Sequence, residues 1–164
     1  MKVFLIGAGM GNPDTLTGAA RHAVEDCEVL VGAERLIASL ASLNCDKLCL
    51  TKTAAIVSAL AESSAATAAV LFSGDVGFYS GALKLHEELS SVDAFDVEML
   101  PGVSSVQYFC AKVPTTWQDA YLISVHGRAC NVCGAVRSHA KTFVLTGGAV
   151  KAQDVCHEIG RAHV

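Results

Sequence analysis

The first stretch of the chain whose residues could do chemistry is FLIGAGMGNPDTLT, at residues 4–17. An apolar run that opens into alternating glycines is typical of a strand followed by a phosphate-binding loop. The dinucleotide fingerprint G-x-G-x-x-G is incomplete here, because Gly7 and Gly9 fit but Asn12 stands at the third position and Pro13 stiffens the turn. A P-loop fits less well still, since no Gly-Lys-Ser/Thr follows. The residues alone leave open a tight turn that needs no ligand, or a nucleotide loop that departs from the fingerprint.

A second candidate is the pair Cys130-x-x-Cys133, which together with His126 and His139 would offer sulfur and nitrogen ligands to a metal ion. The spacing is unusual for zinc, and no second cysteine pair completes a site, so we expect no metal. The chain has seven cysteines, an odd number, and most of them stand in apolar segments. Because no export signal precedes them, we expect reduced thiols in a cytoplasmic protein.

The bulk composition limits the possible partners. The chain has 164 residues, of which 52% are hydrophobic and 17% charged, and its mean hydropathy is +0.43. Such a chain can bury a sizeable core and suits an α/β fold whose parallel strands are covered on both faces. A net charge of −4 argues against nucleic acid as the partner. No apolar run reaches the roughly 18 residues of a membrane span, so we expect no membrane association.

Strand-like and helix-like segments alternate along the chain, which predicts an open, mostly parallel sheet with flanking helices. The predicted strands cover residues 3–8, 28–32, 47–50, 68–73, 95–100, 120–125 and 142–146. The predicted helices cover residues 17–27, 34–43, 53–64, 80–91, 103–112, 131–140 and 150–160, with Thr17 as the N-cap of the first. Because Pro114 ends a helix, we expect an α/β domain at 1–113 and the start of a second at 114–164.

Glycines cluster where the predicted strands end. These clusters fall at residues 7–11, 32, 74–77, 102, 127 and 147–148. The loops that follow parallel strands lie on one edge of the sheet, where ligands bind in open α/β folds. The sequence therefore predicts one concave site formed by several of these loops.

Three of the loops carry ordered motifs: GAGMGNPDTLT at 7–17, LFSGDVGFYSGA at 71–82 and LPGVSSVQYF at 100–109. Together they resemble the tetrapyrrole methylase family, whose members transfer a methyl group from S-adenosylmethionine to carbon atoms of corrin and porphyrin precursors. The resemblance implies a fold of two α/β domains with the methyl donor in the cleft between them. The second domain of that fold would be incomplete here, so we expect a C-terminally truncated form of it.

The resemblance also implies which residues form the site. Contacts to the methyl donor are implied for Gly9, Pro13, Gly74, Asp75, Gly77, Ser104, Ser105, Leu145 and Thr146, and contacts to the substrate for Gly11, His126 and Arg128. Ordinary structural roles stay open: Asp75 could cap the helix that begins near Ser80, the two serines could be helix caps, and His126 and Arg128 could be turn and solvated loop residues. No catalytic residue is assigned, because a sulfonium methyl is already activated and the protein mainly supplies orientation.

Within the family, SVHGR at 124–128 and VGAERL at 31–36 are similar to the branch that methylates ring carbon 5 of precorrin-6Y or cobalt-precorrin-7 in cobalamin biosynthesis. Another methylase of the family, or a binding remnant without activity, are the alternatives. The resemblance further implies a homodimer with a tetrapyrrole substrate. A decarboxylating methyltransferase for ring carbon 15 would be fused to it or act as a separate partner.

Overall fold

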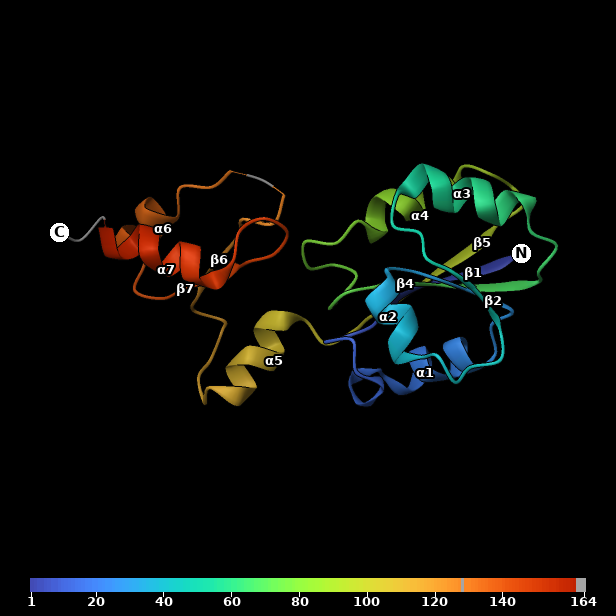
Figure 1. The fold of residues 1–164 in the computed structure, drawn as a ribbon, viewed down its shortest axis with the longest axis horizontal. Helices are drawn as coiled ribbons and strands as arrows, with labels where there is room; N and C mark the ends of the chain where they lie inside the picture. Colours follow the sequence, from blue (N-terminus) through green and yellow to red (C-terminus); the bar gives the residue numbers. More distant parts are fainter. Residues whose placement is uncertain (128, 162–164) are drawn as a thin grey trace. The chain divides into compact units, whose positions relative to one another are not determined.

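A computed structural model of the chain describes residues 1–127 and 129–161. The chain folds into two compact units, Met1–Ser105 and Val106–Val164 (Figure 1). The division falls at the first residue of helix α5 (Ser105–Lys112), whereas the boundary expected from the sequence, 113/114, assigned this helix to the first domain.

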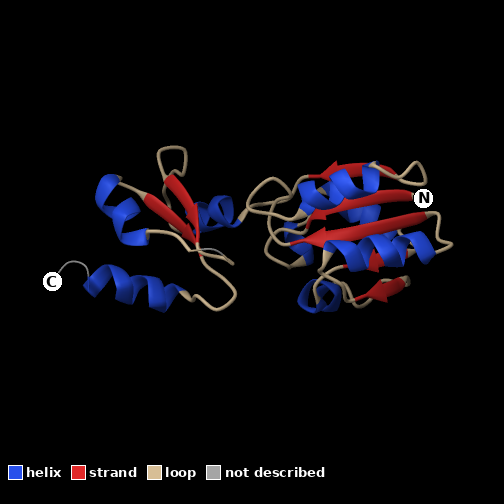
Figure 2. Cartoon of the chain, turned by 90° about the horizontal axis from the view of Figure 1, so that it is seen from above, coloured by secondary structure: helices blue, strands red, loops and turns tan. Residues whose placement is uncertain are grey.

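The first unit contains a sheet of five parallel strands in the order β3-β2-β4-β1-β5 (Figure 2). The strands are β1 (Lys2–Gly7), β2 (Val29–Val31), β3 (Asp46–Leu48), β4 (Thr67–Phe72) and β5 (Asp96–Leu100). This confirms the predicted α/β class. The order makes β4, β1 and β5 direct neighbours, so the three loops with family motifs leave adjacent strands at the same edge.

Helices cover both faces of this sheet, which explains why its central strands are apolar almost throughout. Figure 1 shows α3 (Thr53–Glu62) and α4 (Ala82–Ser90) on one side, and α1 (Gly18–Glu25) on the other, where α2 (Glu34–Ser39) also packs. Successive residues of β1 alternate between the layers: Leu5 packs with α3 and α4, and Ile6 packs with α1 and α2. Thr17 caps α1 as predicted, because its Oγ1 accepts a hydrogen bond from the N–H of Ala20 (3.2 Å).

The second unit has a parallel pair of strands, β6 (Tyr121–Ser124) and β7 (Thr142–Leu145), with α6 (Val132–Ser138) and α7 (Ala152–Arg161). Its small core consists of buried apolar residues from these elements and from the position after β6: Ile123, Val125, Val132 and Val155. Across the residues that the structure describes, no helix is long and apolar enough to cross a membrane.

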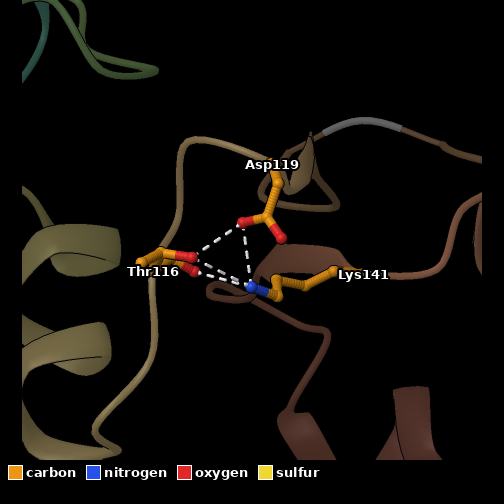
Figure 3. Close-up of polar contacts among 3 residues, drawn as sticks. All are labelled: Thr116, Asp119 and Lys141. Carbon is orange, nitrogen blue, oxygen red and sulfur yellow. Dashed lines mark hydrogen bonds and ion pairs between the residues drawn. The ribbon is translucent and has the colours of Figure 1, made fainter.

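A polar cluster fixes the segment that leads into β6 (Figure 3). Lys141 Nζ donates to Asp119 Oδ1 (2.8 Å) and to the carbonyl oxygen of Thr116 (3.0 Å), while Thr116 Oγ1 also donates to Asp119 (3.0 Å). The hydrogen bond from Lys141, then that from Thr116, lowers the pKa of the Asp119 carboxyl below its usual value. The cluster thus joins the segment before β6 to the start of β7.

Candidate functional site

The loops after β1, β4 and β5 pack backbone against backbone. Gly7 ends β1, and a Cβ placed on it would lie 2.6 Å from the nitrogen of Gly102 and 2.8 Å from the carbonyl oxygen of Gly74. A Cβ on Gly102 would in turn collide with the carbonyl oxygens of Gly7 and Gly74. No side chain fits at either position, so these glycines serve the close approach of three loops to one another. The space beside Gly7 is filled by the protein's own backbone and leaves no room there for a phosphate.

Gly9 and Gly74 lock the first two loops together. The N–H of Gly9 donates to the carbonyl of Gly74 (3.1 Å), and the N–H of Gly74 donates back to the carbonyl of Gly9 (2.7 Å). Both residues have positive φ angles, +60° and +71°, a conformation that glycine adopts without steric cost. The pair forms a rigid two-residue bridge at the edge of the sheet.

Asp75 joins the loop after β4 to the loop after β5. Its Oδ1 accepts a hydrogen bond from the N–H of Gly77 (2.9 Å), and its Oδ2 accepts one from the N–H of Gly102 (3.0 Å). The alternative that Asp75 caps the next helix is wrong, because α4 begins at Ala82 and its N-cap position, Gly81, has no side-chain cap. The carboxylate is therefore a fixed negative charge held between two loops.

The two serines predicted to contact the methyl donor lie beside this cluster. Ser104 is buried and stands directly before α5, and Ser105 is the first residue of that helix. A Cβ on Gly74 would lie 3.8 Å from the Cα of Ser104 and 3.9 Å from the nitrogen of Ser105, which is ordinary van der Waals distance. The fold thus brings Gly9, Gly74, Asp75, Gly77, Ser104 and Ser105 to one edge of the sheet.

The loop around Pro13 is ordered by its own hydrogen bonds. Residues Pro13–Thr15 form a 3-10 turn, η1, which was not predicted from the sequence. The side chain of Asn12 caps this turn by accepting from the N–H of Asp14 (2.9 Å), and Arg21 Nη2 donates to the carbonyl of Pro13 (2.7 Å). These hydrogen bonds fix the loop from both its own residues and α1.

One further candidate at this edge is a residue that the sequence analysis missed. Arg35, in the first turn of α2, donates from Nη2 to Ser73 Oγ, and a Cβ on Gly11 would lie only 2.9 Å from its Nη1. Arg35 therefore contacts the loops after β1 and β4 together. The signal that could have found it is its place in VGAERL, directly after a predicted strand and hence at the same sheet edge.

In the second unit, the predicted residues gather at the carboxyl ends of β6 and β7. The N–H of Val125 donates to the carbonyl of Leu145 (3.0 Å), and Thr146 follows directly. The exposed imidazole of His126 lies against Gly147, in the loop after β7. His126, Leu145 and Thr146 are thus neighbours, whereas Arg128 lies outside the described residues.

Two of the cysteines, Cys27 and Cys110, are buried, whereas Cys49, Cys130 and Cys156 are exposed. Cys27 is buried under α1, and burial, then the neighbouring thiol of Cys45, raises the pKa of its thiol to about 12. Cys133 contacts Glu158, and His139 stacks on Tyr121 with ring centroids 3.9 Å apart. Within residues 1–127 and 129–161, no group of three or more His, Cys, Asp or Glu side chains is arranged to hold a metal ion.

Residues 2–162 match the family model of the Tetrapyrrole (Corrin/Porphyrin) Methylases, and the chain belongs to this family. It is 30% identical over 152 residues to a probable cobalt-precorrin-7 C(5)-methyltransferase of Methanocaldococcus jannaschii, covering 87% of this chain and 70% of that protein. It is 27% identical over 163 residues to the cobalt-precorrin-7 C(5)-methyltransferase of Salmonella typhimurium, covering 97% and 79%. The crystal structure of uroporphyrin-III C-methyl transferase from Thermus thermophilus, complexed with S-adenyl homocysteine, is similar with a TM-score of 0.71 at 21% identity, over 98% of this chain and 72% of that one.

These comparisons confirm the family, its fold and the branch that the loop motifs indicated. Membership of the family also confirms the predicted enzyme class, a methyltransferase, with S-adenosylmethionine as the methyl donor. The roles of the individual site residues, the homodimer and the fused or separate partner stay predictions.

Proposed function

We propose that this chain transfers a methyl group from S-adenosylmethionine to ring carbon 5 of cobalt-precorrin-7, in the biosynthesis of cobalamin. The observation that carries the proposal is the likeness, over most of the chain, to two curated relatives that both bear this C(5)-methyltransferase name. Their names favour the cobalt-containing substrate over precorrin-6Y.

Methyl transfer of this kind requires the two reactants to be correctly oriented and does not require a reactive side chain. S-adenosylmethionine supplies a methyl group bonded to a positively charged sulfur. When the ring carbon attacks this methyl group, the carbon–sulfur bond breaks and the sulfur leaves as a neutral thioether. The chain's own residues must place the two reactants in line and exclude water. Loops that are already locked by hydrogen bonds suit this task, because little further ordering has to accompany binding.

We place this ligand at the edge of the first unit where the three glycine-rich loops meet. A Cβ on Gly74 would make ordinary van der Waals contact with Ser104 and Ser105, so these three residues are close neighbours there. We assign contacts with the methyl donor to Gly9, Pro13, Gly74, Gly77, Ser104 and Ser105, and in the second unit to Leu145 and Thr146. The Asp75 carboxylate, fixed by two backbone N–H groups, provides the negative charge that offsets the sulfonium or the amino group.

Substrate contacts are assigned to Gly11, His126 and Arg128. A precursor of the corrin ring carries several carboxylates, and a protein with a net charge of −4 must meet them with local donors. His126 is exposed at the end of β6, where its imidazole can donate a hydrogen bond or accept a proton.

Calorimetric titration with S-adenosylhomocysteine and, in parallel, with NAD tests the proposal. We expect S-adenosylhomocysteine to bind and NAD not to bind, because the first loop lacks the dinucleotide fingerprint. Binding of NAD without binding of S-adenosylhomocysteine would contradict the proposal. If S-adenosylhomocysteine binds but cobalt-precorrin-7 is not methylated, the protein either acts on a different tetrapyrrole or binds its ligands without catalysis.

A further inference from the structure

Arg35 stands at the edge of the sheet where the site residues of the first unit gather. β2 pairs with β4, so the chain that leaves β2 and enters α2 runs beside the loop that follows β4. That loop begins with Ser73 and continues into Gly74 and Asp75, which are assigned to the methyl-donor site.

One hydrogen bond holds the guanidinium of Arg35, because its Nη2 donates to Ser73 Oγ. Its Nη1 occupies the space in which a side chain at Gly11 would begin. A Cβ at Gly11 would come within 2.9 Å of that nitrogen and within 3.2 Å of Leu36 Cδ2, so any larger residue would push the arginine aside. The absence of a side chain at position 11 therefore makes room for the arginine.

The charge of Arg35 is not neutralised by the protein. Its side chain is exposed, and among residues 1–127 and 129–161 no carboxylate lies within ion-pair distance of it. A guanidinium keeps its charge and offers five N–H donors, of which the contact with Ser73 uses one. Arg35 is thus an exposed cation with open donors in a protein of net charge −4.

We propose that Arg35 binds a peripheral carboxylate of the tetrapyrrole substrate through the planar fork of its guanidinium. The inference rests on the proposed function, because it assumes that the substrate meets this edge of the sheet. A carboxylate is the group that matches the fork with two parallel hydrogen bonds. S-adenosylmethionine also carries a carboxylate, so the test must separate the substrate from the methyl donor.

The test uses two corrinoid probes with the purified protein. Cobyrinic acid has free peripheral carboxyl groups, whereas its complete methyl ester presents the same cobalt-containing ring without carboxylate charges. The variants are Arg35→Gln, Arg35→Lys, and Lys2→Gln as a control with the same loss of charge. Lys2 pairs with Glu98 (2.9 Å) at the amino end of β1, the opposite edge of the same sheet.

We expect Arg35→Gln to weaken the binding of cobyrinic acid about tenfold or more, the usual effect of losing a charged hydrogen bond. Arg35→Lys should give an intermediate affinity, because the charge remains but the fork is lost. Lys2→Gln should bind like the wild type. The affinity for the ester should be the same in all four proteins, and so should the affinity for S-adenosylhomocysteine.

The other possible outcomes separate a failure of this inference from a failure of the proposed function. If the wild type binds neither cobyrinic acid nor S-adenosylhomocysteine, the proposed function fails and the inference with it. If the wild type binds both and Arg35→Gln binds cobyrinic acid equally well, the inference alone is overturned. A loss of affinity for S-adenosylhomocysteine, with cobyrinic acid unaffected, overturns it too and assigns Arg35 to the carboxylate of the methyl donor.

Discussion

The carboxylate of Asp75 accepts a hydrogen bond of 3.0 Å from the backbone N–H of Gly102, a residue 27 positions further along the chain. This bond ties the loop after β4 to the loop after β5, across the intervening strand β1. The geometry of the proposed methyl-donor site thus depends on the Asp75 side chain as a link between two loops, in addition to the charge that we assign to it.

Replacing Asp75 with asparagine should damage both stability and binding. One oxygen would be replaced by an amide donor that faces another N–H, so one hydrogen bond is lost and a donor is left unsatisfied. We expect a loss of about 1–3 kcal/mol in the free energy of unfolding, measured by urea titration, and weaker binding of S-adenosylhomocysteine. Asp93→Asn, at an exposed turn, is the control that should change neither. Equal stability of the two variants would contradict the cross-linking role of Asp75.

Adding a methyl group at Gly7 should be far more harmful than adding one at Gly18. The Cβ at position 7 would overlap with the backbone of two loops, which cannot yield without moving the strand ends. We expect Gly7→Ala to cost about 3 kcal/mol or more in unfolding free energy. At Gly18, in the first turn of α1, nothing lies within 4 Å, so alanine should be neutral or stabilise by up to about 1 kcal/mol. If both variants unfolded at the same urea concentration, the close packing of the loops would be refuted.

Cys27 should make the protein less stable in alkali. The pKa of its thiol is about 12 in the folded state, against 9.0 for an ordinary thiol. The folded protein therefore keeps a proton that the unfolded chain releases. The contribution of Cys27 is fully present below about pH 9 and is lost as the pH rises from there toward the folded pKa.

The corresponding measurement is the unfolding free energy of the wild type and of Cys27→Ala between about pH 8 and pH 10.5. Above pH 9 the stability of the wild type should fall more steeply, by up to about 1 kcal/mol per pH unit, than that of the variant. Cys156→Ala, which removes an exposed thiol, should follow the wild type. Parallel curves for wild type and Cys27→Ala would show that the thiol titrates normally.

Asp119 should make the second unit sensitive to acid. Its hydrogen bonds from Lys141 and Thr116 lower its pKa in the folded state, so its contribution is present at neutral pH and is lost as the pH falls through the folded pKa (Figure 3). We expect the melting temperature of Asp119→Asn to depend less on pH below about pH 4 than that of the wild type. Thr116→Val removes one of the donors, so its acid transition should lie at higher pH than that of the wild type. A variant curve parallel to the wild type would exclude a role for the cluster in acid stability.

Local patterns in the sequence were enough to predict the strands and helices. The apolar run around Leu5 and the cap at Thr17 both depend on neighbours within a few positions, and each element predicted from such patterns is present in the structure. The sites of contact between loops were not predictable in this way. Asp75 was expected either to serve the ligand or to cap a helix, and its bond to Gly102 has no local signal.

The contacts of Arg35 could not be predicted either, because they too have no local signal in the sequence. Its contacts with Ser73 and Gly11 join three loops that are brought together only by the strand order of the sheet. The motif containing Arg35 pointed to a branch of the family, but neither its spacing nor its composition showed which loops it would meet. Tertiary pairing of the strands, rather than any sequence period, determines this part of the site.

The most direct test of the central claim is transfer of an isotopically labelled methyl group from S-adenosylmethionine to cobalt-precorrin-7 by the purified protein, with the product examined by nuclear magnetic resonance. We expect the label to appear on ring carbon 5 and S-adenosylhomocysteine to be formed in equal amount. A label on another ring carbon, or no transfer by a protein that is folded and binds S-adenosylhomocysteine, would contradict it.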